Sequence, residues 1–262
     1  MKLRVALLTA GLSPGDLSAA ARRVSTGAKA LFEFKEVLVL NAENLGNYCP
    51  EVKSRFGTLL NEEVRGYGYW AWKPEFVYRV IKGEFGDFDQ VVWVDAGNEI
   101  NSNSLTRPTF MKRIKKASET GYWLQALENS DLEYTKREVI EQYPNINVSD
   151  LSRPQIQANY FHLQGEIGIK IAEAWFLKTI EKVENTNLEC DKTLENENFI
   201  EHRSDQSILS LVCKSMNLFH SKLNLPSGNS TPSIIRGIVQ PIWISRNRTG
   251  KSIVPDVLRR IP

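Results

Sequence analysis

Short apolar runs of strand length alternate along this chain with segments in which apolar residues recur at helical spacing. This alternation is typical of βαβ units, and it predicts an α/β fold with a mixed, mostly parallel sheet flanked by helices. The expected strands cover residues 4–10, 36–40, 90–94, 122–127, 157–163 and 238–244. The expected helices cover residues 16–32, a segment with Pro74 in its first turn, a segment capped by Thr106, a segment from Ile167 to Trp175, and a segment capped by Ser204. Residues 41–68 are polar and predict a long loop with one helix.

Composition restricts the class of protein. Of the 262 residues, 42% are hydrophobic and 24% are charged, which excludes a disordered or low-complexity chain. No repeat or linker interrupts the pattern, so we expect a single domain over residues 1–262. The formal net charge of +2 lacks the basic excess that binding to a phosphate backbone requires, and we therefore expect no nucleic-acid partner.

The cysteine and apolar patterns indicate the cellular location of the protein. Its three cysteines, Cys49, Cys190 and Cys213, form no C-x-x-C pair, which excludes a zinc–cysteine site and fits reduced thiols in the cytosol. The apolar run at residues 5–10 is too short for a signal peptide and far below the ~20 residues that span a bilayer. We expect a cytoplasmic protein without a transmembrane segment.

Of two common catalytic motifs, one is broken by a single residue and the other is absent from the sequence. Residues 11–15 read GLSPG and match the G-x-S-x-G elbow of α/β-hydrolases. That elbow needs a backbone N–H after the serine, and Pro14 has none. The segment 11–15 is therefore interpreted as a tight turn. A zinc hydrolase is also disfavoured, because the chain has only three histidines and no H-E-x-x-H.

A carboxylate follows the most apolar expected strand. The strand at residues 90–94 reads QVVWV and runs directly into Asp95, at the edge where open α/β sheets bind ligands. A carboxylate there must be hydrogen-bonded, paired or bound to a cation. Gly97 permits close approach of a ligand, and Asn98 and Glu99 add oxygen atoms within one turn. The alternative is that Asp95 only forms a turn or caps a helix.

Two segments in this region resemble a known family. Residues 69–74 read YWAWKP, and residues 92–97 read VWVDAG. Together they resemble the donor-site core of GT-A glycosyltransferases, most closely bacterial members with a W-K-P helix and a strand ending in D-A-G. Asp95 matches the first aspartate of the D-x-D motif, and Gly97 replaces the second. The donor-binding residues that this resemblance implies here are Trp72, Lys73, Asp95, Ala96 and Gly97.

The same resemblance implies a divalent cation. In D-x-D enzymes two aspartates hold Mn²⁺ or Mg²⁺ against the diphosphate of the nucleotide sugar. In this chain Asp95 would be the metal ligand, with Glu99 or His220 as further ligands, or with water. The alternative is a weak metal site or none, because Gly97 has no side chain.

A second motif begins at residue 202 and reads HRSDQ. An Asp-Gln pair at a helix start is similar to the second signature of several glycosyltransferase families, in which the aspartate faces the sugar. At a helix N-terminus the helix dipole stabilises Asp205 as an anion. The catalytic residues predicted from this motif are Asp205, Gln206 and His202, and Arg203 is predicted to bind the donor. The alternative is that Asp205 only helps Ser204 to cap the helix.

Further donor-binding residues are predicted in three other segments. Thr9 and Ala10 end the first strand and would help to seat the nucleotide. Asn159 lies within the expected strand at residues 157–163, and it or Gln157 could meet the sugar at the strand end, whereas His162 is interpreted as structural. The cations Arg246, Arg248 and Lys251 would neutralise the departing diphosphate, or else form a solvated tail.

These observations predict an enzyme that moves a sugar from a nucleotide-diphosphate donor, a UDP-sugar by preference, to a glycan or a small hydroxyl acceptor. The resemblance favours retention of configuration and a role in polysaccharide biosynthesis. The nucleotide-binding half would be about residues 1–100, the acceptor half about 101–245, and the basic tail 246–262. The alternatives are a non-catalytic protein that binds nucleotides or sugars, and a sugar nucleotidyltransferase.

Overall fold

The computed structural model describes residues 3–13, 16–218, 239–244, 246, 248, 249 and 251. Its strands are β1 (Val5–Ala10), β2 (Glu36–Leu40), β3 (Gln90–Val94), β4 (Glu99–Ile100), β5 (Tyr122–Trp123), β6 (Ala126–Ser130), β7 (Pro154–Ile156), β8 (Tyr160–Gln164) and β9 (Ile242–Trp243). The longer helices are α1 (Asp16–Leu31), α5 (Trp72–Ile81), α6 (Arg107–Thr120), α10 (Gly165–Glu181) and α11 (Ser204–Ser215). The short ones are α2 (Leu45–Tyr48), α3 (Pro50–Phe56), α4 (Gly66–Tyr69), α7 (Asp131–Tyr134), α8 (Arg137–Ile140) and α9 (Val148–Leu151), with two 3₁₀ turns at Gly57–Leu59 and Val183–Asn185.

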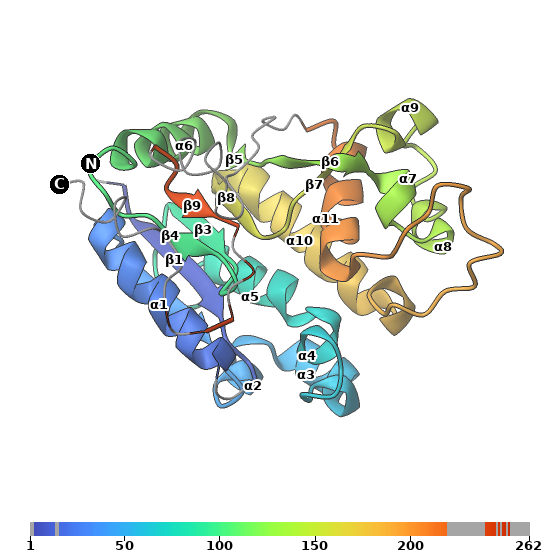
Figure 1. Ribbon diagram of the computed structural model, residues 1–262, viewed down its shortest axis with the longest axis horizontal. Helices are drawn as coiled ribbons and strands as arrows, with labels where there is room; N and C mark the ends of the chain where they lie inside the picture. The colour runs from blue at the N-terminus through green and yellow to red at the C-terminus, as the bar shows by residue number, and fades with distance from the viewer. Residues whose placement is uncertain are drawn as a thin grey trace.

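The main sheet contains five strands in the order β2-β1-β3-β8-β5. Strand β1 pairs in parallel with β2 and β3, while β8 is antiparallel to both β3 and β5. Four of the five strands therefore share one direction, which confirms the predicted mixed, mostly parallel sheet. Two small two-stranded sheets, β4-β9 and β6-β7, lie beside it (Figure 1).

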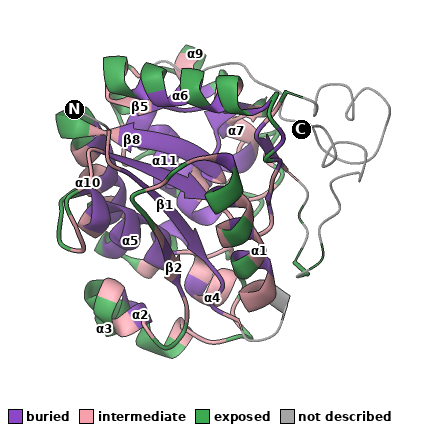
Figure 2. Ribbon diagram, turned by 90° about the vertical axis from the view of Figure 1, so that its left-hand side faces the viewer, coloured by how far each residue is buried: buried purple, intermediate pink, exposed green. Residues whose placement is uncertain are grey.

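Helices cover both faces of the main sheet. One face of β1 carries Ala6 and Leu8, which pack in a core with residues of α5 and α10. The opposite face carries Val5 and Leu7, which pack with residues of α1 and α6. Figure 2 shows the strands buried between these layers, with the exposed residues on the outer sides of α1 and α6. Burial on both faces explains why β1 and β3 are mostly apolar, with one polar residue each, rather than alternating.

The sequence predicted some elements to the residue and missed others. The strands at 36–40 and 90–94 are confirmed with both ends correct. The single strand expected at 122–127 is wrong, because the chain changes sheets between β5 and β6. The strand expected at 157–163 begins only at Tyr160, where pairing with Val94 starts. Ser204 does not cap α11, because Arg203 is the N-cap residue and Ser204 is the first residue of the helix.

The polar segment 41–68 holds more structure than the one helix expected, and it leads into an unusual turn. Five consecutive residues, Gly66 to Trp70, have positive φ angles between 56° and 89°. This left-handed turn costs roughly 1–2 kcal/mol for each residue other than glycine. The indole N–H of Trp72 donates to the carbonyl of Gly66 at 3.0 Å, which ties the turn to the start of α5. The strain is therefore located directly before Lys73.

Substitution of Gly66 by alanine should destabilise the protein by about 1–3 kcal/mol. The φ angle of Gly66 is +68°, and a Cβ there would lie 2.3 Å from Cδ2 of Trp70. Gly57 provides the matched control, since its φ is −47° and a Cβ would meet nothing within 4 Å. Chemical denaturation of the two variants checks this prediction. Equal stability of Gly66→Ala and Gly57→Ala would show that the left-handed turn is not required.

Among the helices that the structure describes, none combines the length and the apolar character needed to cross a bilayer.

Candidate functional site

The side chains of Lys73, Asp95 and Asp205 meet at the carboxyl end of β3. The ammonium of Lys73 lies 3.1 Å from Oδ1 of Asp95 and 2.9 Å from Oδ2 of Asp205. The side chains of Lys73 and Asp205 are only 3% and 6% exposed, whereas that of Asp95 is 33% exposed. A ligand can therefore reach this cluster at Asp95, and the other two charges lie behind it.

Each member of the cluster comes from a different element. Lys73 is the second residue of α5, whose first turn also holds Pro74, a residue that suits this position because its ring fixes a helical φ. Asp95 follows the buried strand β3. Asp205 is the second residue of α11, and its backbone carbonyl accepts a hydrogen bond of 2.8 Å from the indole of Trp175. The fold thus joins the W-K-P, D-A-G and H-R-S-D-Q segments, which lie far apart in the sequence.

Trp93 orients the exposed carboxylate. Its indole N–H donates to Oδ1 of Asp95 at 2.6 Å, and the ammonium of Lys73 lies 5.3 Å from the centre of its ring. The ring also packs against Phe161 in a stacked arrangement with centroids 6.4 Å apart. One rigid aromatic side chain therefore contacts both the lysine and the aspartate of the site. This role of Trp93 was not predicted from the sequence, although its position two residues before Asp95 is visible there.

The acid–base properties of the cluster are set by burial and by mutual attraction. Burial raises the pKa of Asp205 to about 6, although Lys73 opposes that shift. Burial alone would lower the pKa of Lys73, but the attraction of Asp205 and Asp95 outweighs it and leaves the pKa of Lys73 raised. The helix N-terminus favours the anion of Asp205 as predicted, through the backbone N–H of Gln206, but removal from water is the larger effect and leaves the pKa raised.

This pKa shift predicts a pH dependence of stability. Between pH about 4 and 6 the native state keeps a proton on Asp205 that the unfolded chain has lost, so its contribution to stability falls as pH rises through that window. The difference in the free energy of unfolding between the unmodified protein and Asp205→Asn should therefore fall by up to about 3 kcal/mol. Denaturant titrations at several pH values from 4 to 7 measure this difference. A pH-independent difference would contradict the raised pKa.

The D-A-G loop is fixed by several neighbouring segments. The backbone N–H of Asp95 donates to the carbonyl of Asn159 at 2.9 Å, and Nδ2 of Asn98 donates to the same oxygen at 3.0 Å. The guanidinium of Arg23 donates to the carbonyls of Ala96 and Asn98 at 3.0 and 3.1 Å. These contacts place the backbone of Asn159 beside Asp95. Its own Oδ1 is buried and has no hydrogen-bond partner within the described part of the chain.

Part of the segment that carries the predicted tail cations lies near this loop. A Cβ on Gly97 would be 3.6 Å from the Cα of Arg246, so the backbone of Arg246 lies against the D-A-G segment. Arg23 donates to the backbone carbonyl of Thr249, which holds the same tail next to α1. Arg246, Arg248 and Lys251 are exposed side chains. The structure therefore places the Arg246 backbone, though not a defined cationic pocket, beside the site.

Gln206 is half-buried and joins a polar network whose other members, Gln155 and Asp131, are fully buried. Its amide donates to Oε1 of Gln155 at 2.7 Å, and its own oxygen accepts from the N–H of Ala158 at 3.3 Å. Gln155 in turn donates to Oδ1 of Asp131 at 3.1 Å, and Asp131 pairs with Lys214 at 2.5 Å. This network fixes the start of α11 against β7.

The side chains of His202 and Arg203 are both held by neighbouring groups of the protein. His202 is 2% exposed, its Nε2 bonds the carbonyl of Asn185 at 2.9 Å, and its Nδ1 accepts from the N–H of Lys136 at 3.3 Å. Burial lowers its pKa to about 3, so it stays neutral. The guanidinium of Arg203 lies 3.4 Å from the ring centre of Tyr134 and pairs with Glu201. The catalytic role predicted for His202 is therefore not supported by its surroundings, because both ring nitrogens already hold backbone groups.

The remaining predicted residues lie in the interior or outside the described residues. Thr9 and Ala10 are 0% and 8% exposed at the end of β1, and Oγ1 of Thr9 has no partner among the described residues. Trp72 is 5% exposed and packs against Trp93 with centroids 6.1 Å apart, which favours the core interpretation over stacking on a base. Glu99 is 1% exposed on β4. His220 lies outside the described residues.

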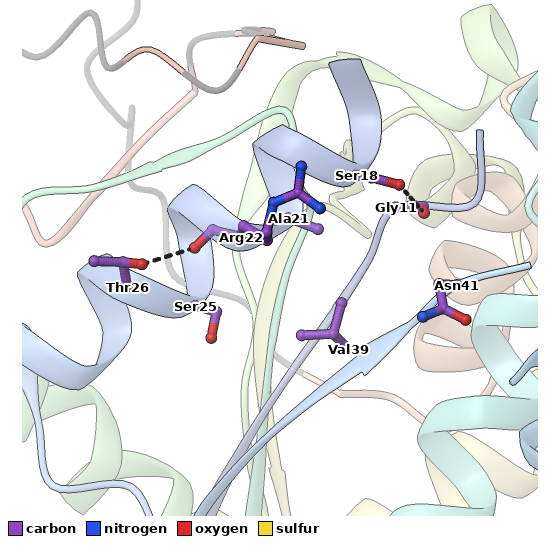
Figure 3. Close-up of a pocket in the computed structure, with 8 residues that line it drawn as sticks. All are labelled: Gly11, Ser18, Ala21, Arg22, Ser25, Thr26, Val39 and Asn41. Carbon is purple, nitrogen blue, oxygen red and sulfur yellow. Dashed lines mark hydrogen bonds between the residues drawn. The ribbon is translucent and has the colours of Figure 1, made fainter. Parts of the chain in front are cut away.

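A pocket of about 310 Å³ lies at the ends of β1 and β2 beside the first half of α1. Figure 3 shows the side chains of Ser18, Arg22 and Asn41 around it, with Ser18 donating to the carbonyl of Gly11 at 3.3 Å. None of these three residues was predicted from the sequence. Asn41 could have been found, because it directly follows a predicted strand at the same edge of the sheet as Asp95.

Comparisons with known proteins give only distant likenesses. No protein-family model matches the chain, and no curated protein matches it. Among solved structures, mouse xyloside xylosyltransferase 1 in its apo form is 10% identical with a TM-score of 0.47, over 92% of this chain and 97% of that one. The apo structure of the WbbM bifunctional glycosyltransferase is 11% identical with a TM-score of 0.45, over 93% of this chain and 46% of that one. Because both likenesses are weak, the chemistry of this chain has to be inferred from its own residues.

Proposed function

We propose that this protein is a GT-A glycosyltransferase that uses a nucleotide-diphosphate sugar. One observation carries the proposal: the two segments that resemble glycosyltransferase signatures, around Asp95 and Asp205, meet within one ion-pair cluster at the carboxyl end of a central strand. Nothing in the local sequence requires segments about a hundred residues apart to meet at a ligand-binding edge. Their convergence is what a donor site requires.

In this proposal each group has a defined task. The bond between the anomeric carbon and the diphosphate breaks, a bond to the acceptor oxygen forms, and the acceptor proton leaves with a base or with the departing phosphate. The exposed carboxylate of Asp95 contacts the donor, and Asp205 stabilises the positive charge that develops on the sugar. Side-chain cations near the D-A-G loop, Arg246 first among them, balance the charge on the leaving diphosphate.

Several finer features of the proposal come from the sequence alone. The family resemblance favours a UDP-sugar donor, a glycan or small hydroxyl acceptor, retention of configuration and a role in polysaccharide biosynthesis. The single-domain organisation and the cytoplasmic location come from the composition and from the cysteine and apolar patterns. The divalent cation that the resemblance implies also stays a prediction.

A thermal-shift screen with nucleoside diphosphates and nucleotide sugars tests the proposal. At a ligand concentration a hundredfold above the dissociation constant, binding adds about 2.7 kcal/mol of stability, which is easily seen as a rise in melting temperature. Release of nucleotide from the donor that gives the shift then separates an enzyme from the second candidate, a non-catalytic sugar-binding protein. A shift without turnover across a panel of sugar acceptors would favour that second candidate, and no shift with any donor would contradict both.

A further inference from the structure

A divalent cation at Asp95 would need oxygen ligands that the described residues do not offer. Mg²⁺ prefers octahedral coordination by oxygen atoms, including one or two carboxylates. Position 97 has no side chain, and Oδ1 of Asp95 already accepts from the indole of Trp93 and contacts Lys73. Within the described ranges there is no group of three or more histidine, cysteine, aspartate or glutamate side chains that could hold a metal ion. These residues therefore do not fit a Mn²⁺ or Mg²⁺ site.

The position between the two carboxylates is taken by a cation that belongs to the chain. A lysine ammonium has three N–H donors, and that of Lys73 has three oxygen neighbours: Asp95 Oδ1 at 3.1 Å, Asp205 Oδ2 at 2.9 Å and the carbonyl of Ala158 at 3.4 Å. The ring of Trp93 covers it as well, with its centre 5.3 Å away. The side chain is 3% exposed. The ammonium is thus surrounded by oxygen atoms and an aromatic face, as a bound metal cation would be by its ligands.

We propose that Lys73 is the built-in cation of this site: its ammonium occupies the position between Asp95 and Asp205 that a divalent metal would otherwise take, and the donor binds without a metal. A metal ion cannot share this position, because it would lie within contact distance of a positive charge. Binding of the donor without a metal rests on the proposed function, whereas the assignment of Lys73 as the cation rests on the geometry alone.

Removal of the lysine should expose the underlying cation site. We would measure Mn²⁺ binding to the full chain by electron paramagnetic resonance, which detects free Mn²⁺, for the unmodified protein, Lys73→Gln and Lys73→Arg. Lys73→Gln leaves two neighbouring carboxylates without their cation and adds an amide oxygen beside them and the carbonyl of Ala158, so it should gain Mn²⁺ binding, which Asp95→Asn in the same chain should abolish. The unmodified protein and Lys73→Arg should bind no Mn²⁺ at this site, because each keeps a positive charge there.

Two results would overturn the inference. One is Mn²⁺ binding by the unmodified protein that Asp95→Asn removes. The other is a folded Lys73→Gln variant that binds no Mn²⁺. If Lys73→Gln does not fold, the unmodified protein decides: equal thermal shifts with UDP or UDP-glucose in a chelator and in Mn²⁺ support the inference, and a shift that needs Mn²⁺ overturns it. No shift with any nucleotide would contradict the proposed function, while the measurement of Mn²⁺ binding still decides the role of Lys73.

Discussion

Replacement of Lys73 by methionine is expected to destabilise the protein by about 3–5 kcal/mol at neutral pH. The change removes the ammonium that Asp95 and Asp205 share, and it leaves the buried carboxylate of Asp205 without a cation. Methionine keeps most of the side-chain volume, so the loss reports charge rather than a cavity. Because Lys73 lowers the pKa of Asp205, this carboxyl takes up its proton at a higher pH in the variant, so the cost should shrink as pH falls toward about 6 and should level off below it. Chemical denaturation at a pH well above 6 and at pH about 6 measures both effects.

The matched control for this variant is Lys170→Met. Lys170 contacts Glu166 at 2.7 Å on the surface of α10, with both side chains more than half exposed. The two lysines therefore make ion pairs of similar length and differ in burial. Because exposed pairs contribute about 0–1 kcal/mol, the control should lose little stability. Comparable losses in the two variants would show that burial is not what makes the Lys73 pair important.

The sheet could be predicted from the sequence because local pattern and tertiary environment agree in its central strands. The strand β3 is buried on both faces, and its apolar run QVVWV ends where the sheet ends, so both limits were correct. The segment 122–127 is different. It keeps an apolar character while the chain passes from the main sheet to the small β6-β7 sheet. Periodicity reports burial and not the identity of the partner strand, so that division was invisible.

The candidate site shows more clearly that a sequence pattern does not reveal tertiary partners. Asp95, Asp205 and Lys73 were each named from motifs, but nothing in the sequence indicated that one ammonium would lie between the two carboxylates. The raised pKa of Asp205 could not be predicted for the same reason: a helix N-terminus is visible in a sequence, whereas burial in a tertiary site, which outweighs it, is not. His202 was misjudged because its neighbours in the motif suggested a site, whereas its hydrogen bonds go to the backbone of Lys136 and Asn185.

Asp205→Asn is expected to lower the rate of sugar transfer by at least ~100-fold, since a carboxylate that stabilises developing charge or accepts a proton typically contributes that much. The change removes the negative charge and keeps the shape, so the backbone carbonyl at 205 can still accept from Trp175. Asp191→Asn is the control, because Asp191 is exposed and pairs only locally with Thr193. Its rate should stay close to that of the unmodified protein.

The pH dependence of the rate distinguishes a direct role of Asp205 from a structural one. In the unmodified protein the rate should rise as pH increases through about 6, where Asp205 loses its proton and becomes the negatively charged form that the transfer step needs. In Asp205→Asn this rise should disappear, whereas a merely structural aspartate would leave the profile unchanged. The measurement is nucleotide release from the donor sugar across pH 5 to 8, with circular dichroism to confirm that the variant is folded. A variant with full activity and an unaltered profile would remove Asp205 from the mechanism and leave Asp95, the exposed carboxylate, as the group that the donor contacts.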